Sequence, residues 1–254
     1  NDDRPMRFQA MQRRLGRKAT AAGLQGSVPV VFMAYDLLEE VGEDLRPLPL
    51  EQRRARLEKF VSSIGASKWI KLSPRVAFAD WSELAAIRAQ ARERAAEGLM
   101  LKRRDSPYRV GRVRGDWWKW KVDPYQIDAV LINAQPGHGK RASLFTDYTF
   151  GVWDQGELVP VAKAYSGLTD AEIREVDRFV RQHTRDRFGP VRVVEPQLVF
   201  ELHFAGLQAS GRHKSGVAVR FPRIGRWRRD KKPDEADTLE TVKALLAREQ
   251  SDAA

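Results

Sequence analysis

The spacing of hydrophobic residues predicts a different architecture in each half of the chain. In residues 47–64 and 80–96, apolar residues recur at helical spacing among charged ones, which predicts two amphipathic helices. Asp80 lies where it can cap the second helix, and Glu83 occupies the capping-box position. Three further stretches are predicted to be strands, the first of them apolar enough to be buried: residues 28–38, 99–103 and 117–122.

After residue 122 the pattern changes to short strands. Asp123-Pro124 marks the boundary, because proline disfavours helix before it and ends strand pairing. A helix is predicted at 170–187, opened by a capping box of Thr169 and Glu172, and a last helix at 238–249. The predicted strands are residues 127–134, 149–153, 158–162, 198–204 and 217–221. This pattern is typical of a small Greek-key barrel such as an OB-fold, so we expect an α+β protein with domains at 1–122 and 123–254.

Composition excludes several kinds of chemistry. The 254 residues contain no cysteine, which rules out disulfides, thiolate metal sites and a cysteine nucleophile. The longest apolar run, residues 28–35, is far shorter than the roughly 20 residues of a membrane helix, and the polar N-terminus shows no secretory signal. We expect a cytoplasmic protein with no membrane partner. The sequence leaves the oligomeric state open, with a monomer as the default.

The positive charge is concentrated in two places. The formal net charge is +11, and residues 1–122 carry 25 basic and 15 acidic residues against 20 and 19 in residues 123–254. Residues 102–121 hold eight basic and two acidic residues, and residues 212–232 hold nine and one. Both stretches interleave these charges with aromatic residues, which indicates a phosphate-rich partner such as a nucleic acid. The alternative is a solvated face that only maintains solubility.

Glu97 begins the segment EGLMLK, in which a carboxylate precedes a glycine and a strand that ends in lysine. A carboxylate among many cations suits Mg²⁺, which binds one or two carboxylates together with substrate phosphates. An ion pair between Glu97 and a nearby arginine is the commoner outcome on spacing alone.

The segment WWKWK at 117–121 places two lysines on one face of a strand. Lys119 and Lys121 point the same way, roughly 7 Å apart, because side chains alternate along a strand. Such neighbouring cations need an anion to offset their repulsion, so the pair predicts a phosphate contact. Trp118 and Trp120 share the opposite face and are predicted to pack in a core. The alternative is a solvated edge strand.

Residues 220–231 form an arginine-rich segment. Arginine forks suit bidentate contacts to phosphate, and Phe221, Ile224 and Trp227 argue that the segment is anchored rather than a disordered tail. The segment PGHGKR at 136–141 lacks the spacing of a P-loop and is predicted to be a hairpin turn. The four histidines show no metal-binding spacing.

Four segments resemble, in the family's order, motifs III to VI of the ATP-dependent DNA ligases, within the covalent nucleotidyltransferase superfamily. They are AYDLL at 34–38, EGLMLK at 97–102, WKWK at 118–121 and RFPRIGRWRRDK at 220–231. The connecting segments 161–170 and 210–216 also resemble parts of the ligase OB domain. The resemblance covers nearly the whole chain and is closest to the bacterial enzymes. It implies the distal part of an adenylation (nucleotidyltransferase, ATP-grasp-like) domain followed by an OB-fold β-barrel.

The resemblance also implies cofactors, a partner and roles for individual residues. The cofactors would be ATP and Mg²⁺, and the partner nicked double-stranded DNA. Tyr35 would stack on the adenine, Glu97 would bind the catalytic metal, and Lys119 and Lys121 would hold the α-phosphate. Arg114 would lie beside a nucleotide or DNA phosphate. The remaining residues would orient the pyrophosphate leaving group: Arg220, Arg223, Arg226, Arg228, Asp230 and Lys231.

One feature of the family is missing. Its nucleophile is a lysine in a KxDGxR motif upstream of motif III, and this sequence contains no such motif. Lys18 and Lys102 lack that context. We therefore interpret the chain as an N-terminally truncated ligase fragment that does not adenylate itself, from an enzyme that seals DNA nicks through lysyl-AMP and DNA-adenylate intermediates. The alternatives are a fragment of an RNA ligase or capping guanylyltransferase, and a non-catalytic OB-type nucleic-acid-binding protein.

Overall fold

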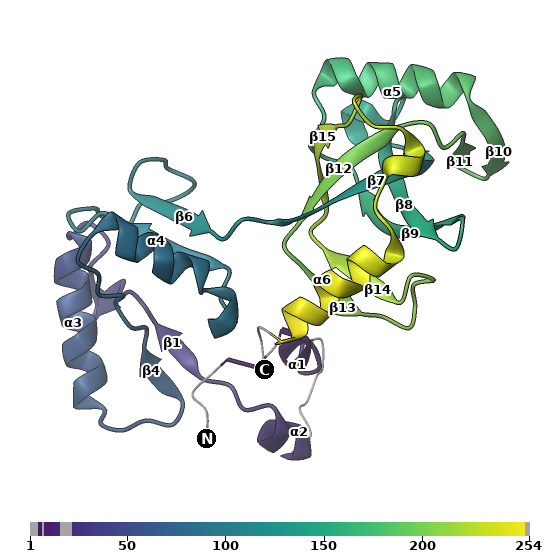
Figure 1. The fold of residues 1–254 in the computed structure, drawn as a ribbon. Coiled ribbons are helices and arrows are strands. Elements are labelled where there is room, and N and C mark those ends of the chain that lie inside the picture. Colours follow the sequence, from purple (N-terminus) through teal and green to yellow (C-terminus); the bar gives the residue numbers. More distant parts are fainter. Residues whose placement is uncertain (1–4, 7, 16–21, 252–254) are drawn as a thin grey trace. The chain divides into compact units, whose positions relative to one another are not determined.

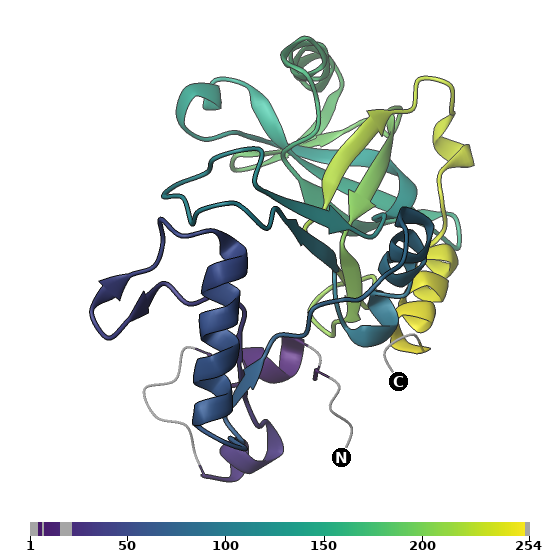
Figure 2. The same ribbon diagram turned by 90° about the vertical axis from the view of Figure 1, so that its left-hand side faces the viewer.

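The computed structural model describes residues 5–6, 8–15 and 22–251, and the chain divides into two compact units that meet between Val122 and Asp123. Figure 1 and Figure 2 show the helices and strands of both units. Lys18, which the sequence left as an isolated lysine, lies outside the described residues. No helix of the described ranges is long and apolar enough to cross a lipid bilayer.

The first unit combines helices with three two-stranded β-pairs among its described residues. Strands β1 and β4 pair in parallel, whereas β2 with β3 and β5 with β6 pair antiparallel. The helices are α1 (Phe8–Gln12), α2 (Ala22–Ser27), α3 (Leu50–Ser63), α4 (Trp81–Ala89) and the short 3₁₀ helix η1 (Arg92–Arg94). The strands are β1 (Phe32–Ala34), β2 (Glu39–Glu40), β3 (Glu43–Asp44), β4 (Ile70–Leu72), β5 (Gly98–Lys102) and β6 (Trp117–Lys121).

The two amphipathic helices predicted for the first unit are present as α3 and α4. The Asp80 side chain caps α4 by accepting hydrogen bonds from the backbone N–H groups of Ser82 and Glu83, as expected for an N-cap residue. The predicted extension of this helix to residue 96 is wrong. The α-helix ends at Ala89, a 3₁₀ turn follows, and Ala95 adopts a left-handed conformation with φ of 52° that a continuing α-helix does not allow.

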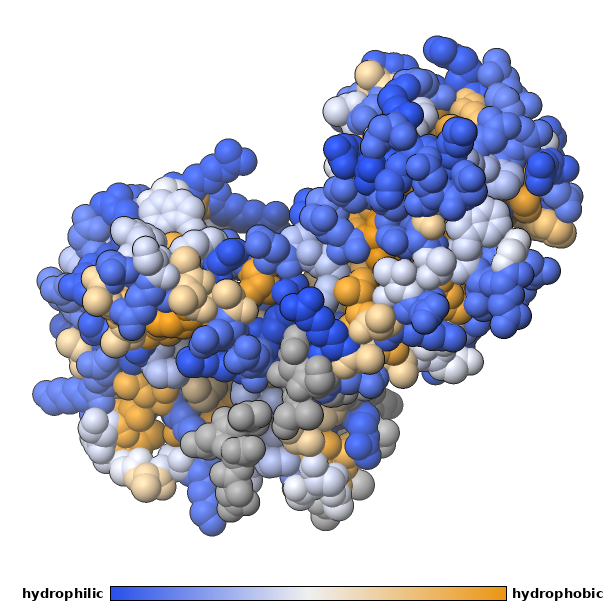
Figure 3. Space-filling view, viewed as in Figure 1, coloured by the Kyte–Doolittle hydropathy of each residue, from blue (hydrophilic) through white to orange (hydrophobic). Residues whose placement is uncertain are grey.

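The strand predicted at residues 28–38 is shorter and more exposed than expected. Only Phe32–Ala34 are in β1, and Phe32 is 68% exposed while Ala34 is buried. In the described part of the chain, β1 pairs with β4 alone, so this short pair is not part of a larger sheet. Figure 3 shows hydrophobic residues at the surface of this unit, and Trp69 beside β4 is likewise 66% exposed.

The second unit is a curled antiparallel sheet with helices at its margins (Figure 1 and Figure 2). Its strand order is β10-β11-β7-β12-β15, with β8 joining β7 to β9 and a separate β13–β14 pair. The strands are β7 (Tyr125–Pro136), β8 (Phe145–Asp154), β9 (Glu157–Ala164), β10 (Thr184–Phe188), β11 (Val191–Val194), β12 (Val199–Phe204), β13 (Gly206–Ala209), β14 (Val217–Arg220) and β15 (Arg223–Trp227). The helices are η2 (Gly139–Arg141), α5 (Asp170–Gln182), η3 (Pro233–Glu235) and α6 (Leu239–Ser251). The curled sheet confirms the expected OB-type barrel.

One hydrophobic core holds the second unit together. It is built from alternate residues of the long strands, such as Ile127, Phe150 and Leu202, with Val176 from α5 and Val242 from α6. A smaller cluster of Val130, Val199 and Ala236 is buried on the other face of β7 and β12, so these strands are covered on both faces there. Helix α5 packs against β8, and α6 packs against β8, β13 and β14.

The helix predicted at 170–187 ends five residues early. Its capping box forms as expected, since Thr169 accepts from the backbone N–H of Glu172 and the Glu172 carboxylate accepts from the Thr169 backbone. Residues 184–188 instead form β10, which pairs antiparallel with β11. The sequence TRDRF has no apolar residue at helical spacing, so nothing would bury a continued helix face. The turn predicted at 136–141 does connect two antiparallel strands, β7 and β8.

Candidate functional site

The antiparallel hairpin of β5 and β6 gathers three lysines on one face. Its register pairs Lys102 with Trp117, Met100 with Lys119 and Gly98 with Lys121. Directly opposite residues share a face, and every second residue of a strand does too. Lys102, Lys119 and Lys121 therefore lie on the same face of the hairpin, where Lys119 and Lys121 are exposed. The sequence placed Lys119 and Lys121 together, and the register adds Lys102.

Glu97 and Lys121 form an ion pair at the end of this hairpin. Lys121 Nζ donates to Glu97 Oε2 at 2.9 Å, and both side chains are 56% exposed. Glu97 thus takes part in an ion pair, as the sequence-based alternative expected, with Lys121 as a partner. Such an exposed pair contributes little to stability, so a phosphate or a metal ion can exchange for either partner at low cost.

The residues at Glu97 fit a divalent cation only together with a substrate. No group of three or more His, Asp and Glu side chains in the described ranges could hold a metal ion by itself. Glu97 supplies one carboxylate, and Mg²⁺ commonly binds through one or two carboxylates plus substrate phosphates. The three lysines of the hairpin would bind those same phosphates.

Gly98 allows the two strands to approach closely beside this pair. Its φ of +137° is outside the range that L side chains normally adopt, and a Cβ atom there would lie 2.3 Å from the Trp120 carbonyl oxygen. A glycine is therefore required where Glu97 enters the strand. The backbone N–H of Val122 donates to the Glu97 carbonyl at 3.0 Å and extends the hairpin past Lys121.

Lys102 lies between two aromatic rings. Its ammonium is 4.4 Å from the ring centroid of Tyr35 and 4.0 Å from that of Trp117, within the range of cation–π attraction. Burial lowers the pKa of Lys102, a shift that the nearby Arg53 and Arg54 reinforce and Asp36 opposes. Tyr35 is 51% exposed.

A buried ion pair lies behind Tyr35. The Arg53 guanidinium of α3 donates from Nε and Nη2 to the two carboxylate oxygens of Asp36, each at 2.9 Å. Arg53 also donates to the carbonyls of Leu48 and Ser106. Arg53 is completely buried. The sequence does not predict this pair, because Arg53 looks like any other polar residue of an amphipathic helix. Only the structure shows that its side chain lies on the buried face of α3.

The remaining predicted residues of the first unit differ in their surroundings. Arg114 is exposed in the segment between β5 and β6. Trp120 packs against Trp81 of α4 at a ring distance of 6.3 Å, and the Arg88 guanidinium lies 5.1 Å from the Trp120 ring centroid. Trp118 is 47% exposed, so the prediction that it packs in a core is wrong, and Trp120 is half-buried.

In the second unit, the arginine-rich segment 220–231 runs from the end of β14 through β15 to a turn. Ile224 is buried in the core and Trp227 packs against Phe200, so the segment is anchored as predicted. Phe221 is not an anchor: it is 73% exposed and has a φ of +52°. Arg220 lies 5.5 Å from the Phe221 ring. The guanidinium groups of Arg223 and Arg226 belong to exposed residues of β15.

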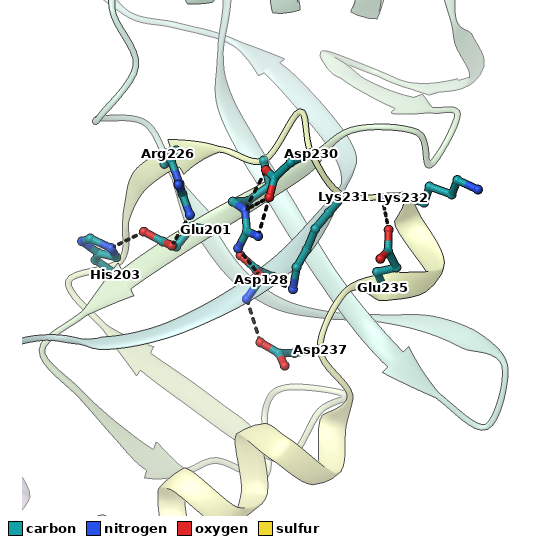
Figure 4. Close-up of polar contacts among 10 residues, drawn as sticks. Asp128, Glu201, His203, Arg226, Asp230, Lys231, Lys232, Glu235 and Asp237 are labelled. Carbon is teal, nitrogen blue, oxygen red and sulfur yellow. Dashed lines mark hydrogen bonds and ion pairs between the residues drawn. The ribbon is translucent and has the colours of Figure 1, made fainter.

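Asp128 of β7 holds the end of this segment (Figure 4). Asp128 Oδ2 accepts from Arg228 Nη1 and from Lys231 Nζ, both at 2.7 Å. Arg228 also binds Asp230 at 2.7 Å. These hydrogen bonds lower the pKa of Asp230 and raise that of Arg228. The backbone N–H of Asp128 donates to Asp237 at 2.7 Å and ties the network to the chain that follows.

A second carboxylate, Glu201 of β12, faces β15 (Figure 4). Its Oε2 lies 3.3 Å from Arg226 Nη2, and its Oε1 lies 2.8 Å from His203 Nε2. Arg229 is turned to a different partner, since it pairs with Glu175 of α5 at 2.6 Å and stacks on Trp227 at 3.9 Å. Arg228 and Arg229 thus each bind a carboxylate closely. Of these three arginines, Arg226 has the longest distance to a carboxylate, 3.3 Å.

The two groups of residues suit the handling of phosphate esters. The hairpin face offers three ammonium groups, one carboxylate and a tyrosine ring, which together match the phosphates, metal and base of a nucleotide. Segment 220–231 offers exposed guanidinium groups on a strand held by carboxylates. Clustered cations of this kind stabilise the charge that develops on a transferred phosphoryl group.

Comparison with known proteins assigns both units to one family. The model of the ATP dependent DNA ligase domain matches residues 1–121, and that of the ATP dependent DNA ligase C terminal region matches residues 141–231. A probable DNA ligase of Koribacter versatilis is 40% identical over 259 residues, which cover 94% of this chain and 45% of the relative. A DNA ligase of Methanoculleus marisnigri is 35% identical over 251 residues, which cover 98% of this chain and 44% of the relative.

Solved structures share the fold. One described as "DNA binding with a minimal scaffold: Structure-function analysis of Lig E DNA ligases" has a TM-score of 0.61 at 17% identity, over 88% of this chain and 74% of the other. One unit carries a lysine hairpin lined by aromatic residues, and the other carries an arginine-rich strand on an OB-type barrel. The chain belongs to the ATP-dependent DNA ligase family. The chain spans a little less than half the length of the two relatives.

Proposed function

We propose that this chain supplies the distal part of the adenylation domain (residues 1–122) and the OB domain (residues 123–254) of an enzyme that seals nicks in double-stranded DNA. ATP and Mg²⁺ are its cofactors. The observation that carries the proposal is the shared face of Lys102, Lys119 and Lys121 with Glu97 beside it. In this proposal, lysyl-AMP forms first with release of pyrophosphate, and AMP passes to the 5′-phosphate of a nick. The 3′-hydroxyl then attacks that phosphate, which forms the phosphodiester and releases AMP.

Each residue has a separate role in this proposal. Tyr35 stacks on the adenine, and Lys119 and Lys121 hold the α-phosphate and neutralise its charge as the bond to the leaving group breaks. Glu97 would hold the divalent cation in place of its contact with Lys121, and the cation would supply further charge neutralisation. Arg114 contacts a nucleotide or DNA phosphate.

Segment 220–231 has two subsets of residues in this proposal. Arg220, Arg223 and Arg226 orient the pyrophosphate leaving group. Arg228, Asp230 and Lys231 keep the segment in place through Asp128, because all three belong to one hydrogen-bonded network. The enzyme acts on DNA as a monomer in the bacterial cytosol.

Binding measurements on the chain test the proposal against its alternatives. We expect the chain to bind ATP more tightly than GTP, and nicked duplex more tightly than intact duplex or single strands at matched salt. A capping-type enzyme would prefer GTP. A non-catalytic OB protein would bind all three DNAs alike, with an affinity that falls steeply with salt and no nucleotide affinity, and that result would contradict the proposal.

A further inference from the structure

A cavity in the second unit lies away from segment 220–231 and is lined mostly by arginines. Its volume is about 310 Å³, and its lining residues are Phe145, Arg181, Thr184, Arg187 and Arg192. These residues come from the start of β8, the last turn of α5 and both strands of the β10–β11 hairpin. Three of the five carry a permanent positive charge, and none carries a negative one.

The hairpin places two of these arginines directly opposite each other. Arg187 of β10 and Arg192 of β11 are register partners in the antiparallel pair. Like charges at directly opposed positions destabilise a sheet. A hairpin that places two guanidinium groups together is stabilised by an anion between them, and phosphate suits the planar fork of arginine.

The third arginine is oriented toward the same place from α5. The guanidinium carbons of Arg181 and Arg192 lie 5.4 Å and 5.7 Å from the ring centroid of Phe145, which is itself 8% exposed. Arg181 is bound by Asp177 at 2.7 Å and donates to the Ser143 carbonyl, while Arg192 donates to the Gly189 carbonyl at 2.8 Å. These contacts fix the two side chains before any ligand binds. Asp177 offsets only one of the three charges.

We propose that Arg181, Arg187 and Arg192 form a binding site for a phosphate group, distinct from the nucleotide residues and from segment 220–231. The ligand is either a phosphodiester of a nucleic-acid backbone or a free phosphate such as pyrophosphate. Both present the same oxygen atoms to the arginine forks. The site needs no nucleotidyl transfer, so it goes beyond the proposed function and can be tested without ATP.

The test compares the double variant Arg187→Gln/Arg192→Gln with a control of equal charge, Arg174→Gln/Arg178→Gln, which removes two exposed arginines of α5 that do not line the cavity. Duplex DNA binding is measured over a range of salt, and pyrophosphate binding by calorimetry. If a DNA backbone is the ligand, the cavity variant lowers the slope of log K against log salt by about 1–2 relative to the control. If a free phosphate is the ligand, the cavity variant loses one pyrophosphate site that the wild type and the control keep, in addition to any pyrophosphate bound at segment 220–231.

Either result supports the site and identifies its ligand. The proposal is overturned if the cavity variant and the control behave alike in both measurements. Thermal unfolding of each variant checks that the fold is kept, and should the double variant unfold, the single Arg187→Gln variant replaces it, because Arg187 is exposed on β10. Nick sealing depends on other residues, so a failure here would leave the proposed function standing.

Discussion

At the scale of single residues, Asp230 shows how segment 220–231 is held. Its carboxylate is 62% exposed, yet its hydrogen bonds to Arg228 keep its pKa below the ordinary value of 3.8. A carboxylate with a lowered pKa contributes to stability above its ordinary pKa. That contribution is lost as the pH falls below this value and through the pKa of the folded state. Solvent screening keeps the contribution small.

Replacing Arg228 should release Asp230. In the Arg228→Gln variant we expect the titration midpoint of the Asp230 carboxyl, followed by NMR, to rise toward 3.8. The matched control is Arg229→Gln, because Arg229 pairs with Glu175 instead. An unchanged midpoint in Arg228→Gln, or an equal rise in both variants, would show that Arg228 is not the cause.

Gly98 is the residue at which the lysine hairpin should be most sensitive to a single methyl group. In Gly98→Ala, the added Cβ would meet the Trp120 carbonyl at 2.3 Å in a conformation with positive φ. We expect a loss of unfolding free energy above the roughly 1–3 kcal/mol of a strained backbone alone. The control is Gly115→Ala, which also has a positive φ of +104° but no atom within 4 Å of its Cβ. Equal losses in chemical denaturation would contradict the close approach.

At the scale of elements, the buried pair of Arg53 and Asp36 joins α3 to the segment that carries Tyr35. Removing one partner leaves a buried charge unpaired, which costs about 3–5 kcal/mol. We expect Arg53→Ala to lower the unfolding free energy by about that amount in urea denaturation. The control on the same helix is Arg56→Ala, whose exposed contacts to Glu40 and Glu43 should contribute little. Similar losses of unfolding free energy in both variants would contradict the claim that the buried pair holds the Tyr35 segment on α3.

The sequence predicts an element when the element's own residues show an apolar face or a capping residue. Helices α3, α4, α5 and α6 were predicted because each has an apolar face or a capping residue such as Asp80 or Thr169. Strands β10, β11, β13 and β15 are not predicted, because each has only four or five residues and becomes a strand through pairing with its neighbours. The sequence does not predict that Asp128 and Glu201 contact segment 220–231, because strand pairing brings them there from distant positions in the chain.

At the scale of the whole molecule, the two basic stretches occupy different units and different surroundings. Residues 102–121 provide exposed lysines on a hairpin, with one carboxylate beside them. Residues 212–232 contain arginines of which several are bound by carboxylates of their own unit. The first stretch also contains bound arginines, since Arg103 pairs with Asp105 and Arg109 with Asp116. Both stretches therefore combine paired cations with exposed ones.

The chain as it stands should not adenylate itself. It contains no KxDGxR motif, and Lys102, whose pKa is lowered, lies between Tyr35 and Trp117 rather than in that motif. After incubation with labelled ATP and Mg²⁺, we expect no AMP adduct that survives denaturation. The appearance of a covalent adduct would identify a nucleophile among the lysines present, and peptide mapping would locate it.

The most direct test of the account is nick sealing by a graft. Residues 1–254 replace the matching segment of the Koribacter versatilis relative, and the chimera is assayed on nicked DNA with ATP and Mg²⁺. We predict sealing by the chimera and its loss in the Lys121→Ala form, with the fold of both verified by circular dichroism. A folded chimera that cannot seal a nick, or full sealing without Lys121, would contradict the account.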